Sequence, residues 1–492
     1  MGSGIIKNII ICLILVVLAF VVGSMAADGA RDSLMVLGAI LGGFALLYLG
    51  KNCWWLVFVV PPVLGVLPLG FLQRLPVAYY LCGVILLYWM MLRMMGYVRV
   101  TWHKVAWIDF ITLILFLYVA YSYFLHPVEL MIFSDEDTEF VGGKEYVHAI
   151  AACVGYVALS IIPCSIERLN KVLKWALFAQ FAALALVVVK YHTLSALSVF
   201  GQPIFLIMAC KYSLFGLIIA PWKLLLLLFA LSLSLHGQRE VFVTAAFTYI
   251  GISFVKKQVI LCMLAAAATV GMLTYLSSEG VLLSLPHRIQ RTLYILPWLK
   301  IDKEIATEAQ HSSDWRLEMW GWAMDPRTRY IKDYVWGDGF GQSLKLLRLT
   351  TIALNRGDVS GGDQQRFAES GVWHSGVFTT IHRLGIVGLC IIVLWHLAAM
   401  FMIIRVCMVF DRQKKGLYLM YHTMPFVGGV FTFYISAGTI VMFFSQLHMV
   451  AVAKIAYSEA LRTGMMLPLF TRHQYIPLAI REMDSAPPPV TR

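Results

Sequence analysis

Apolar runs long enough to cross a bilayer recur along this chain from residue 5 to residue 461, and they constrain its fold more than any other feature. A helix needs roughly 20 consecutive apolar residues to span the hydrocarbon core. Separated at charged residues, glycines and prolines, the runs predict an all-α, polytopic membrane bundle of about 14 helices. The expected spans are residues 5–22, 33–50, 53–72, 75–92, 107–125, 146–163, 172–190, 204–219, 220–236, 240–255, 258–276, 376–404, 418–437 and 440–460.

Composition agrees with a membrane protein and excludes several other classes. Of 492 residues, 60% are hydrophobic and 13% are charged, with a mean hydropathy of +0.78, whereas roughly a quarter of the residues in a soluble domain are charged. Soluble enzymes, disordered regulators and disulfide-stapled secreted proteins are therefore excluded. The nine cysteines lie within or at the edges of apolar runs, which is typical of small core side chains and predicts neither a disulfide framework nor a metal cluster.

The distribution of lysine and arginine predicts the orientation, because cytoplasmic loops are enriched in these residues. If the N-terminus is cytoplasmic, the loops on that side carry most of the basic residues, and both termini are then cytoplasmic. The net charge of +12 is read as this bias rather than as a sign of nucleic-acid binding. Residues 5–22 are read as a retained first helix rather than a cleaved signal peptide. The opposite short loops hold Arg31, Arg74, Lys144, Lys190 and Arg239.

One long polar segment, residues 277–373, interrupts the apolar runs. It carries twelve basic and twelve acidic residues and several tryptophans, a content that argues against disorder. Because ordered segments of this length are usually functional, we expect a folded helical cap outside the cytoplasm. The expected organisation is residues 1–276 as N-terminal transmembrane helices, 277–373 as the cap, 374–461 as C-terminal transmembrane helices and 462–492 as a cytoplasmic tail.

Arg239 is the first candidate site residue, because it lies between two apolar runs at the predicted outer surface. A charged side chain at that depth is costly unless it pairs or faces water. An ion pair with Glu240, or a snorkelling position at the interface, would explain it without a function.

The cap holds the second candidate, in residues 312–324, which predict a short helix with serine and aspartate caps at its N-terminus. Arg316, Trp320 and Ala323 follow the i, i+4, i+7 spacing of one helix face, so the arginine is expected beside apolar residues that face the rest of the protein. The alternative is a surface ion pair with an acidic residue two positions away, a spacing that does not suit a helix-surface pair.

Two further features follow along the chain. The glycine-rich turn at residues 337–341 is not read as a dinucleotide loop, because no strand precedes it. His374 lies where the cap re-enters the membrane, and His382 and the pair Gly385 and Gly388 come after it. A histidine at this place is often only structural, yet it is the side chain most easily set as a base near neutral pH.

In this order the residues resemble the O-antigen ligase and Wzy-type polysaccharide polymerase superfamily of bacterial inner membranes. The resemblance rests on an arginine at the outer end of a mid-chain helix, an Arg-x-x-x-Trp-x-x-Ala segment and a Gly-x-Gly-x-Gly turn in a long outer loop, and a histidine with Gly-x-x-Gly eleven residues on. It covers the part of the chain from residue 230 to residue 405. Where the family often has small residues beside the first arginine, this chain has Gln238 and Glu240. The matching residues are Arg239, Arg316 to Ala323, Gly337 to Gly341, His374, Gly385 and Gly388.

The resemblance implies a GT-C-like fold and a metal-independent, inverting glycosyltransferase without a cofactor, active at the periplasmic face of the bacterial inner membrane. The donor would be a glycan on undecaprenyl diphosphate. The acceptor would be another lipid-linked glycan in a polymerase, which the larger helix count favours, or lipid A core in a ligase. Other polysaccharide assembly proteins would be further partners. The catalytic residues would be His374, Arg239 and Arg316, and the substrate-binding residues Arg239, Arg316, Arg291, Gly339, Gly341 and His382.

The residue types suit this chemistry. Arginine makes planar, bidentate and permanently charged contacts with phosphate groups, and preorganised charge at a developing anion is a dominant catalytic contribution in many enzymes. His374 would accept the proton of the acceptor hydroxyl or orient that hydroxyl. Two nearby guanidinium groups would keep the imidazole neutral and a bound diphosphate would oppose them, so the direction of its pKa shift stays open.

Two other functions stay open on the sequence. A metal-dependent glycosyltransferase would use Asp135 and Asp137 as a metal-binding pair, although consecutive acidic residues in an outer loop are more often only solvated. A lipid-linked glycan transporter or flippase would need ionisable residues near the membrane midplane, where the chain has only Lys211, Arg383 and Lys454. A structural function is favoured over a catalytic one for five further polar residues, His311, Asp314, Arg291, Asp363 and Glu369.

Overall fold

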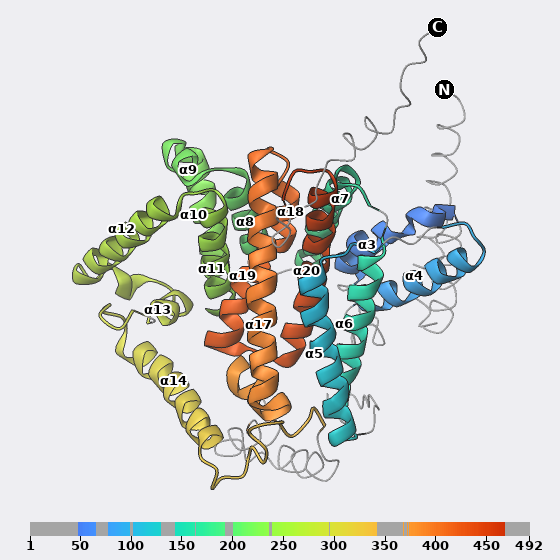
Figure 1. The fold of residues 1–492 in the computed structure, drawn as a ribbon. Helices are drawn as coiled ribbons and strands as arrows, with labels where there is room; N and C mark the ends of the chain where they lie inside the picture. The colour runs from blue at the N-terminus through green and yellow to red at the C-terminus, as the bar shows by residue number, and fades with distance from the viewer. Residues whose placement is uncertain are drawn as a thin grey trace, which may run out of the picture. The chain divides into compact units, whose positions relative to one another are not determined.

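The computed structural model describes residues 48–64, 77–98, 102–128, 143–162, 164–191, 200–235, 239–294, 296–341, 368, 371 and 373–467. Within these ranges the chain is helical and contains no strand (Figure 1). Several predictions concern residues outside the description. They are the span 5–22, most of the span 33–50, the tail, and the acidic residues Asp135, Asp137, Asp363 and Glu369.

The described helices follow one another with short connections. In chain order they are η1 (Gly50–Trp55), α3 (Leu56–Leu64), α4 (Val77–Met94), α5 (Ala106–Leu125), α6 (Lys144–Ser160), α7 (Ile166–Tyr191), α8 (Gly201–Lys211), α9 (Leu214–Ile219), α10 (Pro221–Leu235), α11 (Arg239–Val255), α12 (Val259–Ser278), η3 (Val281–Ser284), α13 (His287–Leu293), α14 (Lys303–Met324), α17 (Gly376–Arg412), α18 (Leu417–Thr423), α19 (Pro425–Thr432), the π-helix η4 (Phe433–Ala437) and α20 (Ile440–Arg462).

The chain divides into two compact units. The first comprises residues 1–56 and 84–99, of which the structure describes η1 and the later part of α4. The second comprises residues 57–83 and 100–492 and contains nearly all of α3, the first part of α4 and the helices from α5 to α20.

Six helices of the described residues are long and apolar enough to cross a membrane, and four shorter apolar helices accompany them. The all-α prediction is confirmed for these residues. The six apolar helices support the assignment to the class of membrane proteins. The total of about 14 spans stays a prediction. The six helices are Val77–Met94, Ala106–Leu125, Ile166–Val189, Val259–Ser278, Gly376–Arg412 and Ile440–Arg462.

Two predicted spans are broken in the structure. The stretch 204–219 divides into α8 and α9, because the backbone becomes extended at Tyr212 and Ser213 caps the next helix by accepting a hydrogen bond from the amide of Gly216 at 3.0 Å. The stretch 418–437 divides into α18, α19 and η4, with Pro425 at the start of α19. The backbone stays helical through Met424 and Phe433 in the second stretch, whereas Tyr212 and Ser213 are extended in the first.

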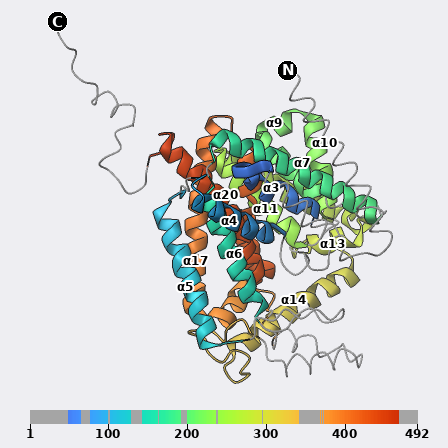
Figure 2. The same cartoon turned by 90° about the vertical axis from the view of Figure 1, so that its right-hand side faces the viewer.

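Helices α5, α6, α17 and α20 form the centre of the second unit, and they lie side by side in both views (Figures 1 and 2). The indole of Trp395 on α17 donates to the hydroxyl of Thr112 on α5 at 3.0 Å. Lys454 on α20 is completely buried, where it forms an ion pair with Asp109 on α5 and donates to the hydroxyl of Ser160 on α6 at 2.7 Å. These contacts tie the central helices together.

Helix α17 is broken at Gly385, where the backbone takes φ 67° and ψ −177°. Gly376, its first residue, lies directly against the carbonyl and ring of Phe433, whose ring centroid is 5.5 Å from that of His396. Twenty residues of straight helix would separate Gly376 from His396 by about 30 Å. The first leg of α17 (residues 376–384) must therefore fold back along the second leg (residues 386–412).

The turn after α14 holds this break in place through backbone hydrogen bonds. The amides of Asp338 and Gly339 donate to the carbonyls of His382 and Arg383 at 2.7 and 3.1 Å, and the amide of Ile386 donates to the carbonyl of Tyr334 at 2.8 Å. A Cβ on Gly385 would collide with the carbonyl of Val335. The close approach of the two backbones thus depends on glycine.

Candidate functional site

Helix α14 brings the cap against the start of α17. It begins at Lys303, where the side chain of Asp302 accepts from the amides of Glu304 and Ile305. The prediction that this helix starts near Ser312 is therefore wrong, because an earlier aspartate satisfies its first amides. Ser313 lies inside the helix and donates to the carbonyl of Ala309 at 3.1 Å.

The predicted inward face of α14 is confirmed. Trp320 donates from its indole to the carbonyl of Trp373 at 2.9 Å. Ala323 is completely buried in a cluster with Met319, Ile331 and Trp373. Burial of this face holds α14 against residues 373–378 and sets the position of the arginine one turn before Trp320.

Arg316 lies on this docked helix without a carboxylate partner. Its Nη1 donates to the carbonyl and hydroxyl of Ser312, both at 3.4 Å, and its buried Nε forms no hydrogen bond. Among the ion pairs of the described residues, none involves Arg316, so the alternative of a surface ion pair is not what the structure contains. A guanidinium in this state can accept an anion without first breaking a salt bridge.

His374 packs against Trp315, the residue that precedes Arg316 on α14. Its ring centroid is 5.4 Å from that of Trp315, and its backbone is left-handed, with φ 48°. Burial lowers the pKa of His374 below 6.5, and the nearby charge of Arg316 lowers it further. The imidazole is therefore neutral at pH 7 and able to accept a proton. A non-glycine residue in this backbone region is uncommon and often belongs to a functional site.

A second histidine holds the residue that precedes His374. The indole of Trp373 donates to Nδ1 of His382 at 3.0 Å, and Nε2 of His382 lies 3.5 Å from the carboxylate of Asp338. Because Nδ1 accepts a hydrogen bond, neutral His382 carries its proton on Nε2 and directs it to Asp338. The arrangement fixes Trp373 and gives His382, predicted to bind substrate, a structural function in the cap.

The glycines predicted to bind substrate also have packing reasons. A Cβ on Gly339 would lie 2.7 Å from Cβ of His126, and a Cβ on Gly341 would collide with Val128. The carbonyl of Gly339 accepts from Nη1 of buried Arg383 at 3.3 Å, and Nε of Arg383 lies 3.3 Å from the carboxylate of Glu145. The glycine turn, the first leg of α17 and α6 are thus joined around one buried arginine.

Arg239 is the first residue of α11, and its side chain is outside the described part of the structure. Five residues further along α11, Thr244 hydrogen bonds to Thr432 at 2.6 Å. The next residue, Phe433, lies against Gly376, two residues after His374. Because five helical residues rise only about 7.5 Å, the start of α11 belongs to the same end of the bundle as His374, with η4 between them.

Arg291 does not share the surroundings of Arg316. Its Nη1 lies 2.7 Å from the carboxylate of Glu308, which also lies 2.9 Å from Nε2 of His287. This pair joins α13 to α14 and gives Arg291 a structural partner.

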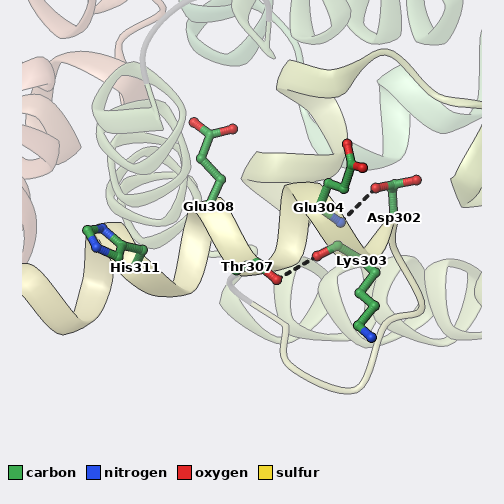
Figure 3. A pocket seen from close by; sticks show the side chains of 6 residues that line it. All are labelled: Asp302, Lys303, Glu304, Thr307, Glu308 and His311. Carbon is green, nitrogen blue, oxygen red and sulfur yellow. Dashed lines mark hydrogen bonds between the residues drawn. The ribbon is translucent and has the colours of Figure 1, made fainter.

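An open pocket along the first turns of α14 does not include the predicted catalytic residues. Figure 3 shows its side chains, all from α14 and its capping aspartate. His311, interpreted as structural before catalytic, is exposed there. The described residues contain no group of three or more histidine, cysteine or acidic side chains placed to hold a metal ion. The pocket is lined by Asp302, Lys303, Glu304, Thr307, Glu308 and His311.

Sequence reasoning missed Glu145 and Asp338 as the partners of Arg383 and His382. An aspartate between two glycines is typical of a turn, so Asp338 carried a local signal. Glu145 carried none, because it gains its partner only when distant helices pack. No protein-family model matches this chain, and no curated protein shows significant sequence similarity to it.

Proposed function

We propose that this protein is a membrane glycosyltransferase that moves a glycan from a lipid diphosphate to an acceptor hydroxyl at the outer surface of the bacterial inner membrane. The observation that carries the proposal is the pairing of Arg316, a guanidinium without a carboxylate partner, with the neutral imidazole of His374. The first supplies charge for a departing diphosphate, and the second accepts a proton.

The reaction is a single displacement. The acceptor oxygen attacks the anomeric carbon of the donor and forms the new glycosidic bond, while the bond from that carbon to the diphosphate oxygen breaks. The electron pair leaves with the diphosphate, whose charge Arg316 and Arg239 stabilise. The proton of the acceptor hydroxyl passes to the imidazole of His374. One displacement inverts the anomeric configuration, so a product of retained configuration would contradict this mechanism.

The surroundings of the other buried charges favour this proposal over a transporter. Lys454 is paired with Asp109, and Arg383 with Glu145. Both pairs join helices of the bundle, whereas Arg316 has no carboxylate partner among the described residues and is suited to an anionic substrate. Of the two kinds of glycosyltransferase, we favour a polysaccharide polymerase that uses an undecaprenyl-diphosphate glycan. A ligase that transfers the glycan to lipid A core is the alternative.

The test is transfer by the purified full-length protein with an undecaprenyl-diphosphate glycan as donor, with and without chelator. The wild type is compared with Arg316→Ala and with Arg327→Ala, a matched change of an exposed arginine in the cap. We expect transfer that persists in chelator, is lost in Arg316→Ala and is retained in Arg327→Ala. Lengthening of lipid-linked chains identifies a polymerase, and transfer only to added lipid A core identifies a ligase. Equal activity in the two arginine variants would contradict the proposed site.

A further inference from the structure

Three polar side chains form a hydrogen-bonded chain that joins α17, η4 and α20, and the transfer described above does not use them. His396 lies on the second leg of α17, Tyr434 on η4 and Gln446 on α20. Nδ1 of His396 is 2.8 Å from the hydroxyl of Tyr434, and its Nε2 is 2.8 Å from Oε1 of Gln446. His396 and Gln446 are 1% and 2% exposed, whereas Tyr434 is only partly buried.

The direction of these hydrogen bonds follows from the amide of Gln446. Its oxygen can only accept, so Nε2 of His396 carries the proton and Nδ1 is an acceptor. The hydroxyl of Tyr434 must then donate to Nδ1. This leaves the lone pairs of the Tyr434 oxygen directed away from the imidazole, ready to accept a hydrogen bond from another hydroxyl.

The aromatic surroundings of His396 make these buried polar groups unfavourable for folding, which favours a functional reason for them. The ring of His396 has aromatic neighbours with centroids 5.3 to 5.9 Å away, and Nε2 of Gln446 forms no hydrogen bond. Polar groups in an apolar interior cost free energy that packed apolar side chains would not. Polar groups within membrane bundles are accordingly often functional. The aromatic neighbours are Trp395, Phe426, Phe433, Tyr434 and Phe443.

Tyr434 directly follows two residues that contact the elements of the candidate site. Thr432 hydrogen bonds to α11 five residues after Arg239, and Phe433 lies against Gly376, two residues after His374. The element that carries Tyr434 is a π-helix, a widened turn that occurs frequently at functional sites.

We propose that Tyr434 binds a second hydroxyl of the acceptor sugar, adjacent to the one that reacts, and that His396 and Gln446 are positioning residues for Tyr434. This inference rests on the proposed function. The acceptor hydroxyl donates to the Tyr434 oxygen and thereby holds the reacting hydroxyl toward His374. Water has no second hydroxyl, so hydrolysis of the donor does not depend on this contact.

The experiment compares transfer and hydrolysis in the full-length protein in lipid nanodiscs, with an undecaprenyl-diphosphate glycan as donor and a lipid-linked glycan as acceptor. We expect Tyr434→Phe to lower kcat/KM for the acceptor by about tenfold to a hundredfold, which corresponds to about 1.4–2.7 kcal/mol and is in the range of a lost hydrogen bond, while donor hydrolysis stays within about twofold. His396→Asn keeps an oxygen near the position of Nδ1, so its loss of transfer should be smaller.

The matched control is Tyr421→Phe on α18. It removes a tyrosine hydroxyl that donates a hydrogen bond to the side-chain oxygen of Gln180 at 2.8 Å. It should leave the ratio of transfer to hydrolysis unchanged. A Tyr434→Phe variant with wild-type transfer, or with transfer and hydrolysis reduced equally, would overturn the inference and leave the proposed function intact. A wild type that neither transfers nor hydrolyses the donor would overturn both.

Discussion

The indole of Trp373 donates to Nδ1 of His382 at 3.0 Å, across the point where the cap meets the first leg of α17. Trp373 is completely buried, and its carbonyl accepts from Trp320 of the cap helix. The residue that follows it, His374, takes a left-handed backbone conformation. The position of the proposed base is therefore set by contacts of its neighbour rather than by its own side chain alone.

This relationship predicts the effect of replacing His382. His382→Phe keeps the ring and removes the acceptor for the Trp373 indole, and a buried donor without a partner costs about 1–3 kcal/mol. We expect a lower melting temperature and a lower kcat, with donor affinity unchanged. The melting curve in detergent and donor binding by the purified protein check this.

The same pair of measurements separates the two interpretations of His382. If His382 contacts the donor, as the sequence predicts, donor affinity should fall while the melting temperature stays near that of the wild type. His311→Gln, a change of an exposed histidine on α14, is the matched control and should alter neither quantity.

The second prediction concerns pH. Burial and the charge of Arg316 lower the pKa of His374 below 6.5. The folded state therefore binds this proton less readily than the unfolded state, and as pH falls from 6.5 toward the lowered pKa, both stability and the supply of neutral base decline. In the wild type, we expect the acidic limb of kcat/KM below pH 6.5.

Removing the charge of Arg316 should shift the acidic limb of kcat/KM to higher pH. The residual activity of Arg316→Gln should fall at a pH closer to 6.5, because only burial then lowers the pKa of His374. His374→Asn, which tolerates the left-handed backbone better than alanine does, should lose activity without losing stability. If the acidic limb is unchanged in Arg316→Gln, titration of His374 does not set the pH dependence.

The third prediction tests the contact between the glycine turn and the break in α17. Gly385→Ala places a Cβ against the carbonyl of Val335 at φ 67°. We expect a loss of at least about 1–3 kcal/mol from this glycine-restricted backbone conformation alone, seen as a lower melting temperature. Gly321→Ala in the cap helix meets no atom within 4 Å and should be neutral or stabilising by up to about 1 kcal/mol. Equal melting temperatures in the two variants would contradict the role of Gly385.

Sequence periodicity predicted the face of α14 correctly, because spacing within one helix is a local property. Arg316, Trp320 and Ala323 share that face in the structure, and the last two are held by contacts with the core. The start of the helix was missed, since Ser312 and Asp302 are both good capping residues. Choosing between them requires the packing of the preceding turns.

The function of the glycine turn could not be predicted from the sequence for the same reason. Gly337 and Gly385 are 48 positions apart in the chain, and each prevents a collision with the backbone of the other's segment. Tyr434 and His396 lie inside apolar runs that predict only helices. Their hydrogen bond exists because α17 and η4 pack together, a relationship that no local pattern contains.

The fourth prediction concerns the buried ion pair of Lys454 and Asp109, which lies in the bundle away from His374. Lys454 is completely buried, between the rings of Trp102 and Tyr156, each 4.5 Å from Nζ. Lys454→Met leaves the carboxylate of Asp109 without its cation, and breaking a buried pair costs about 3–5 kcal/mol. Thermal unfolding in detergent should show a clear loss, part of which Asp109→Asn restores in the double variant.

The ion pair at the end of the same helix provides the comparison for this measurement. The side chain of Arg462 is 65% exposed and lies 2.8 Å from the carboxylate of Glu459, whose side chain is 8% exposed. Because the cation of this pair is largely solvated and that of the other pair is completely buried, Arg462→Met should lower the melting temperature less than Lys454→Met. If the two variants unfold at the same temperature, the buried pair does not stabilise the bundle. Lys454 would then need another explanation, and a part in transport would become the first to test, because an unneeded charge within a membrane bundle is itself a sign of function.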